Sequence, residues 1–156
     1  MSETSFRGDC SRCAGLCCVM LSFDRGPHFA FGKSAGEACG HLTNGHRCAI
    51  HDRLAAEGMT GCVRFDCMGA GQLVTEMFDG LTPQTSPAVS RAMSLAFART
   101  REVQTLRRLV RDASPDAELD VSLAEATTSY AALLKLDLGH ARRAASAIVR
   151  ASGRPS

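Results

Sequence analysis

Residues 10–18 read CSRCAGLCC and place four cysteines within nine positions: Cys10, Cys13, Cys17 and Cys18. The spacing of Cys10 and Cys13 lets two thiolates from one tight turn face the same metal ion, and Gly15 allows the chain to bend back. The adjacent pair is less ordinary, because neighbouring side chains point apart. Cys17 and Cys18 would therefore serve two metals, or one metal and one packing role, with Cys18 the more readily structural of the two.

Four further cysteines follow at looser spacing, Cys39, Cys48, Cys62 and Cys67, and no cysteine lies beyond residue 67. Glycines beside Cys39 and Cys62 free the backbone to approach an ion, and Cys48-x-x-His51 offers a further ligand pair. Cys67 precedes a predicted helix, whose dipole would favour a thiolate there. The simplest assignment of the eight cysteines is to two metal sites of four ligands each, with His51 able to replace one thiolate. The candidate metal ligands are Cys10, Cys13, Cys17, Cys18, Cys39, Cys48, Cys62, Cys67 and His51.

The remaining histidines and motifs carry little chemistry. We assign His28, His41 and His46 to loop surfaces and His140 to a helix surface. The sequence contains no phosphate-binding Walker loop, no dinucleotide fingerprint and no zincin helix, and we nominate no catalytic residue. Clustering of the cysteines favours coordination over nucleophilic catalysis, so the sequence leans against an enzyme.

Two other readings of the cysteines are less favoured. Buried inert cysteines occur singly or in pairs, not as eight clustered residues. A four-disulfide framework needs an oxidising compartment. The apolar run at residues 14–23 contains two cysteines, has acidic as well as basic residues before it and is followed by no cleavage site, so it does not read as a signal peptide. We therefore expect a cytoplasmic protein with reduced thiols.

The chain divides into a loop-rich part and a helical part, and its 156 residues suit one compact unit. Residues 1–80 predict a Cys-rich metal-binding module. Within it we expect a short strand or extended segment at residues 29–31, a short helix at 50–57 stopped by Gly58, and a helix at 67–78 capped by Asp66.

Residues 81–156 predict a helical hairpin packed on this module. Ser86 and Pro87 form a helix start, apolar residues then recur at helical spacing to Val110, and Ser114-Pro115 closes the helix. A second helix is predicted over residues 116–138, interrupted at Gly139, with a helical continuation over 141–151. The fold class expected is mainly α: a loop-rich, metal-organised N-terminal half with short helices, followed by the hairpin.

Charge and hydropathy exclude some partners. The net charge is +2, and residues 86–156 carry eleven Lys/Arg and seven Asp/Glu with no basic run of five or more. This pattern indicates a solvated helix face rather than a nucleic-acid site. No stretch approaches the ~20 apolar residues that span a bilayer. The expected partners are metal ions and, through the C-terminal helices, another protein.

The motif Cys10-x-x-Cys13-x-x-x-Cys17-Cys18 resembles the signature of the zinc- or iron-chelating domain family named for CxxCxxxCC. The segments Cys39-Gly-His-Leu and Cys48-Ala-Ile-His51, followed by Cys62, resemble that family's second block, although an Arg-Pro usual between its last cysteines is absent. The resemblance covers residues 8–72 and implies metal chelation. Some members resemble protein lysine methylases, which would imply an iron–sulfur cluster.

Residues 61–72 also resemble a cysteine-rich module found ahead of pentapeptide repeats in some bacterial proteins, but no such repeat occurs in this chain. The first hypothesis is a zinc protein with structural or chelating sites. The alternative is an iron–sulfur protein with a redox or enzyme-associated role. A third, copper(I) handling, suits soft thiolates but gains little from the methionines.

Overall fold

The computed structural model describes residues 6–115 and 117–153. Its elements are the 3-10 turns η2 (Cys10–Arg12) and η3 (His51–Arg53) and the helices α1 (Leu16–Met20), α2 (Thr60–Arg64), α3 (Ala70–Met77), α4 (Pro87–Ala113), α5 (Glu118–Ala126), α6 (Tyr130–Lys135) and α7 (Leu138–Ala151). The described residues form no β-strand, only three isolated bridges. The prediction of a mainly α protein is confirmed.

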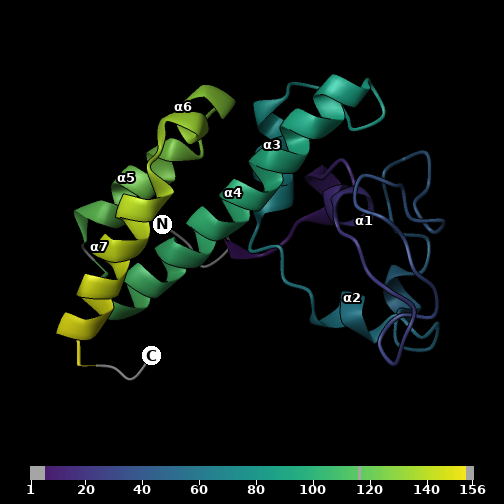
Figure 1. The fold of residues 1–156 in the computed structure, drawn as a ribbon, viewed down its shortest axis with the longest axis horizontal. Helices are drawn as coiled ribbons and strands as arrows, with labels where there is room; N and C mark the ends of the chain where they lie inside the picture. Colours follow the sequence, from purple (N-terminus) through teal and green to yellow (C-terminus); the bar gives the residue numbers. More distant parts are fainter. Residues whose placement is uncertain (1–5, 116, 154–156) are drawn as a thin grey trace.

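Helix α4 is the spine of the molecule, and Figure 1 shows it between the Cys-rich loops and helices α5 to α7. The Ser86 side chain accepts a hydrogen bond from the Val89 amide at 3.2 Å, and Pro87 occupies the first turn, as predicted. The helix runs for 27 residues and ends at Ser114. Met93 and Val103 lie on its fully buried face.

The helix predicted over residues 116–138 is two helices, with residue 116 itself outside the described part of the chain. The Thr127 hydroxyl donates to the Ala124 carbonyl at 2.8 Å, and the Thr128 hydroxyl donates to that of Glu125 at 2.7 Å. These bonds close α5. Ser129 then begins α6 by accepting from the Ala132 amide at 3.1 Å.

The interruption of the helical pattern that was predicted at Gly139 lies earlier in the chain. Asp137 caps α7 by accepting from the His140 amide at 2.9 Å, so Gly139 falls inside the first turn. Arg99 of α4 fixes the connection by donating to the carbonyls of Leu133 at 2.9 Å and Leu136 at 2.6 Å. Helices α5, α6 and α7 all contact α4, so three helices cover it where a hairpin was expected.

The Cys-rich part is less regular than predicted. Residues 29–31 form no strand, because the backbone pairs only through isolated bridges such as Phe23 with Lys33. The helix predicted over 50–57 is the short turn η3 followed by further turns to Gly58, which has the expected positive φ of 74°. Asp66 caps a turn rather than a helix, accepting from the Met68 amide at 2.8 Å, and α3 begins only at Ala70.

One hydrophobic cluster joins the two parts. Leu16 of α1 and Val74 of α3 are fully buried in the same cluster as Met93 of α4, Leu123 of α5 and Leu133 of α6. The division at residue 80 stays a prediction, but the core is continuous across it. Within the described residues no helix is long and apolar enough to cross a bilayer.

Beside this core lies a buried ionic network. The Asp120 carboxylate of α5 forms ion pairs with Arg107 and Arg111, both at 2.8 Å. Arg107 also donates a hydrogen bond to Gln104 at 2.8 Å. Both guanidinium groups lie over the ring of Phe6. The buried carboxylate is therefore fully paired, which is the condition under which a buried charge is tolerated.

Candidate metal-binding site

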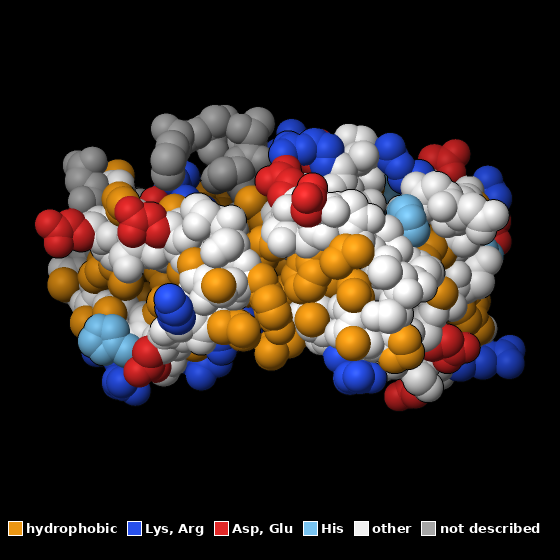
Figure 2. Space-filling model, turned by 90° about the horizontal axis from the view of Figure 1, so that it is seen from above, with side chains coloured by type: hydrophobic (Ala, Val, Ile, Leu, Met, Phe, Trp, Pro, Cys, Tyr) orange, Lys and Arg blue, Asp and Glu red, His pale blue; other side chains and the backbone are white. Residues whose placement is uncertain are grey.

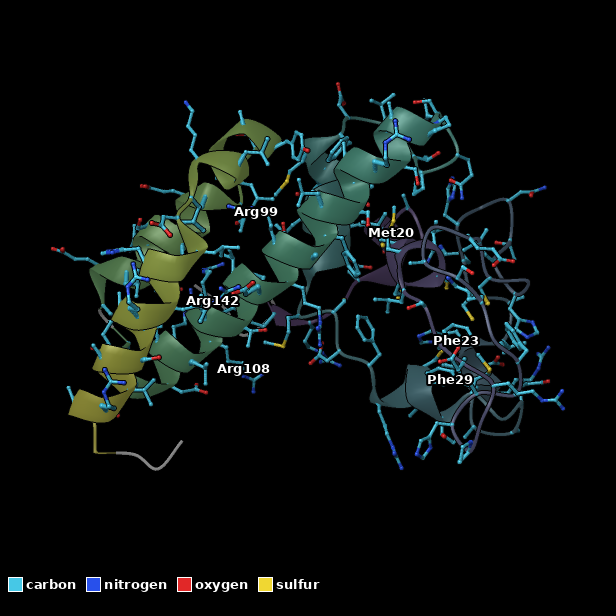
Figure 3. The ribbon with its side chains drawn as sticks, viewed as in Figure 1. Met20, Phe23, Phe29, Arg99, Arg108 and Arg142 are labelled. Atoms are coloured by element: carbon cyan, nitrogen blue, oxygen red, sulfur yellow. The ribbon has the colours of Figure 1, made fainter. Side chains whose placement is uncertain are left out.

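All eight cysteines line one cavity of about 650 Å³ in the N-terminal part, here called the cysteine cavity. All eight are free thiols. They come from η2 and the residue that caps its C-terminus, from α1 and α2, and from the loops between residues 39 and 67. Figure 3 shows sulfur atoms in this region near the labelled Phe23 and Phe29, well away from Arg99 and Arg142 of the helical part. Cysteines far apart in the sequence thus share one space.

Four of them form a first cysteine group: Cys10, Cys13, Cys17 and Cys67. Burial raises the pKa of Cys10, and the negative charges of the other three raise it further. Burial likewise raises the pKa of Cys13, with Cys17 and Cys67 adding to the effect. The sequence pattern groups Cys67 with the later cysteines, but in the fold Cys67 lies beside the CxxC turn.

Two glycines leave room for sulfur in this group. A Cβ atom at Gly8 would lie 2.9 Å from the Sγ of Cys67, and a Cβ atom at Gly71 would lie 2.7 Å from the Sγ of Cys13. Any larger residue at either position would displace a thiol. Gly71 of α3 therefore packs against the CxxC turn.

Helix α3 holds the CxxC turn through two polar side chains. The Gln72 amide accepts from the Asp9 backbone amide at 3.1 Å and donates to the Arg7 carbonyl at 2.8 Å. The Thr75 hydroxyl accepts from the Ala14 amide at 2.9 Å. The turn is thus fixed on both sides of Cys10 and Cys13 by one helix.

Helix α4 holds the segment around Cys67, which contributes the fourth cysteine of the first group. Arg101 donates to the Asp66 carbonyl at 2.9 Å, and Gln104 donates to the Met68 carbonyl at 3.0 Å. Met68 has a positive φ of 54°, an uncommon conformation for a side chain of this size. The two clamps hold the backbone on either side of Cys67.

The other four form a second cysteine group: Cys18, Cys39, Cys48 and Cys62. The Cys39 amide donates to the Cys18 carbonyl at 2.8 Å, and Cys48 pairs with Leu42 in an isolated bridge. Burial raises the pKa of Cys62, and the charges of Cys17, Cys39 and Cys48 raise it further. In the first group Cys13, Cys17 and Cys67 pack against the main core cluster, whereas no cysteine of the second group does so in the described structure.

The adjacent cysteines connect the groups. The Cys18 thiol donates a hydrogen bond to the sulfur of Cys17, which lowers the pKa of Cys17 to about 7 and raises that of Cys18. The pair contributes one thiol to each group. The sequence allowed Cys18 either a metal-binding or a packing role. In the structure Cys18 has other cysteines as neighbours.

Aromatic rings lie beside the second cysteine group. The Phe29 ring stacks on Phe23 with centroids 4.4 Å apart, and Phe31 meets Phe23 edge-on at 5.5 Å. A Cβ atom at Gly61 would lie 2.0 Å from the Phe29 ring. Gly61 therefore makes room for an aromatic ring beside Cys62.

The histidines divide differently from the prediction. His51 lines the cavity, but so do His41 and His46. In the described structure the Nδ1 of His46 is buried without a hydrogen-bond partner, and His46 has a φ of 60°. His28 contacts Thr60 and Arg64 instead. No local signal marks His46, because its burial depends on the tertiary fold.

Within residues 6–115 and 117–153, no three Cys, His, Asp or Glu side chains are gathered closely enough to hold a metal ion as they stand. The cysteines share a cavity and perturb one another's ionisation, but they are not drawn into coordination geometry.

The chain is similar to an uncharacterized protein, YybG, of Bacillus subtilis (strain 168), with 38% identity over 90 residues. This alignment covers 57% of the chain and 32% of the relative, so the chain spans about a third of that protein's length. No protein-family model and no solved structure matches the chain.

Proposed function

We propose that the N-terminal part binds metal ions through its clustered thiolates, with zinc as the first candidate and two ions as the simplest stoichiometry. The observation that supports this best is that eight free thiols line one cavity. Four thiolates form a common complete set for structural zinc. Cysteine packing alone gives no reason for so many neighbouring thiols.

The residues present fit such ions. Both groups supply soft sulfur donors, and the glycines at positions 8 and 71 already make room for two of them. Burial opposes ionisation of Cys10, Cys13 and Cys62, and a bound cation would reverse that preference while releasing their protons. Because the thiols are not yet gathered around any point, binding would draw them together. Zinc–sulfur distances of about 2.3 Å are expected.

Two histidines supply alternative donors at the same cavity. His51 can replace one thiolate, as the sequence indicates. His46 offers a buried ring nitrogen with no partner in the described structure. Imidazole suits zinc as well as thiolate does.

An iron–sulfur cluster is the second candidate, and the cavity favours it in one respect. Its volume of about 650 Å³ has room for a larger group than two single ions, and the Phe23 and Phe29 rings screen one side. Four cysteines also hold such clusters. A redox or enzyme-associated role would then follow.

Anaerobic purification with elemental analysis and a visible spectrum tests both candidates. A colourless protein with two zinc ions per chain supports the zinc site. A brown protein with iron and acid-labile sulfide supports the cluster. A protein that holds neither metal, and takes up none when supplied with Zn²⁺ or reconstituted with iron and sulfide, contradicts the proposed function.

The setting of the protein is part of the proposal. Eight reduced thiols suit the cytoplasm, where disulfides rarely form. The helical part offers a surface for another protein: Figure 2 shows apolar side chains across the middle of one face. Exposed apolar residues of α4 to α6 include Leu95, Leu109, Val121 and Leu134.

A further inference from the structure

Lys33 is a buried ammonium beside the second cysteine group. Only 8% of its surface is exposed. Its Nζ donates to the carbonyls of Val19 and Ser34, both at 3.1 Å, and also to that of Leu21. The ammonium lies 5.6 Å from the centroid of the Phe23 ring. These partners are all neutral, so they satisfy its hydrogen bonds but supply no counter-charge.

No carboxylate fills that role. In the part of the chain that the structure describes, no Asp or Glu oxygen forms an ion pair with Lys33. The acid that acts on it is Glu37, whose exposed carboxylate accepts from the Ser34 amide at 3.1 Å. A buried cation without a close anion is costly, and proteins retain one where another charge offsets it.

The chain next to Lys33 also carries two cysteines of the second group. Cys39 and Cys18 are joined through their backbones at 2.8 Å, and Val19, which follows Cys18, accepts from the ammonium. Burial lowers the pKa of Lys33, while the charges of Cys39, Glu37, Cys18 and Cys17 act in the opposite direction. The ammonium is thus anchored on the carbonyl of the residue that follows Cys18, at the edge of the segment that carries the second cysteine group.

We propose that Lys33 is the counter-ion of the second cysteine group, neutralising part of the negative charge that its thiolates carry when they hold a cation. The inference rests on the proposed function. A divalent ion with four thiolates has a net charge of −2, and Lys33 offsets one unit of it from a position fixed by three carbonyls. Lys33 is a positioning and charge-balancing residue, not a ligand.

The test measures Zn²⁺ affinity at the two sites by competition with a chromophoric chelator, on the full chain. A variant with Cys10→Ser and Cys13→Ser isolates the second group. In that background Lys33→Met, which removes the charge and keeps the stem, is expected to weaken Zn²⁺ binding about 10- to 100-fold, as loss of a group supporting a metal ligand does. Lys33→Arg is expected to retain most of the affinity.

Two controls separate charge from folding. Lys33→Gln keeps a donor for the carbonyls without the charge, and it replaces Lys33→Met if that variant does not fold. Arg99→Met removes another side chain that donates to backbone carbonyls, in the helical part, and should lower the Tm of the protein without changing Zn²⁺ affinity.

Equal affinities for the neutral and charged residues at position 33 would overturn the role of Lys33. Loss of Zn²⁺ binding in Lys33→Arg as large as in Lys33→Gln would also overturn it, because shape and not charge would then decide. Failure of the unaltered protein to bind metal would be seen before any variant is made, and would instead overturn the proposed function on which the inference rests.

Discussion

The helical part and the loops between residues 22 and 68 reach stability by different means. Helices α4 to α7 bury apolar faces against one another, and α4, α6 and α7 begin at side-chain caps. In the loops, only Lys33, Cys39, Ile50 and Met59 are buried, and none of these belongs to the main core cluster. A segment of that length has little apolar burial to hold it, and under the proposed function bound metal ions would add to its order.

The largest expected effect comes from removing a ligand of the first group. We expect Cys13→Ser to cost one of two bound metal ions, because three thiolates hold zinc far more weakly than four. Structural zinc contributes about 10–16 kcal/mol in small domains, so partial unfolding around the CxxC turn should accompany the loss. Metal analysis and limited proteolysis measure both effects. Retention of both ions would show that Cys13 is not a ligand.

The next largest effect is expected from a substitution that creates a cavity in the helical core. Met93 is fully buried in α4, so Met93→Ala should cost about 2–5 kcal/mol in the free energy of unfolding. We expect urea denaturation to report this loss while the metal content stays unchanged. A loss of metal in the folded variant would mean that the two regions are not stabilised separately.

How far the sequence predicts this molecule depends on whether a signal is local. Helix α4 was predicted at both ends because Ser86-Pro87 and Ser114-Pro115 act within one turn. The break between α5 and α6 was missed, because the apolar spacing continues through it while Thr127 and Thr128 end the helix by bonding to the preceding turn.

The same limit applies to the cysteines. The spacing of Cys10 and Cys13 predicts a shared turn, but the placement of Cys67 beside them depends on contacts with Gly8, distant in sequence. The side chains of Gln72 and Gln104, which hold both segments, carry no motif. His46 was assigned to the surface, because nothing in its neighbours predicts a buried ring nitrogen.

A smaller effect is expected at the contact between α3 and the CxxC turn. Gln72→Leu removes the amide that holds the Arg7 carbonyl and the Asp9 amide. Affinity for metal at the first group should fall about 10-fold, with the second group unaffected, since Gln72 orients the turn and touches no sulfur. Competition with a chelator measures it. Equal weakening at both groups would indicate a general loss of structure instead.

The smallest effect should come from a helix cap. Ser86→Ala removes the bond to the Val89 amide and should cost about 1 kcal/mol. Thermal unfolding followed by far-UV CD measures it. A change in metal stoichiometry is not expected, and would link the start of α4 to the cysteine cavity.

The most direct test follows proteolysis of the unaltered protein before and after metal removal by a chelator. We predict release of two metal ions, rapid cleavage within residues 22–68, and continued protection of α4 to α7 with their helical CD signal. Identical cleavage patterns and CD spectra with and without chelator would contradict the idea that metal ions organise the cysteine-rich part.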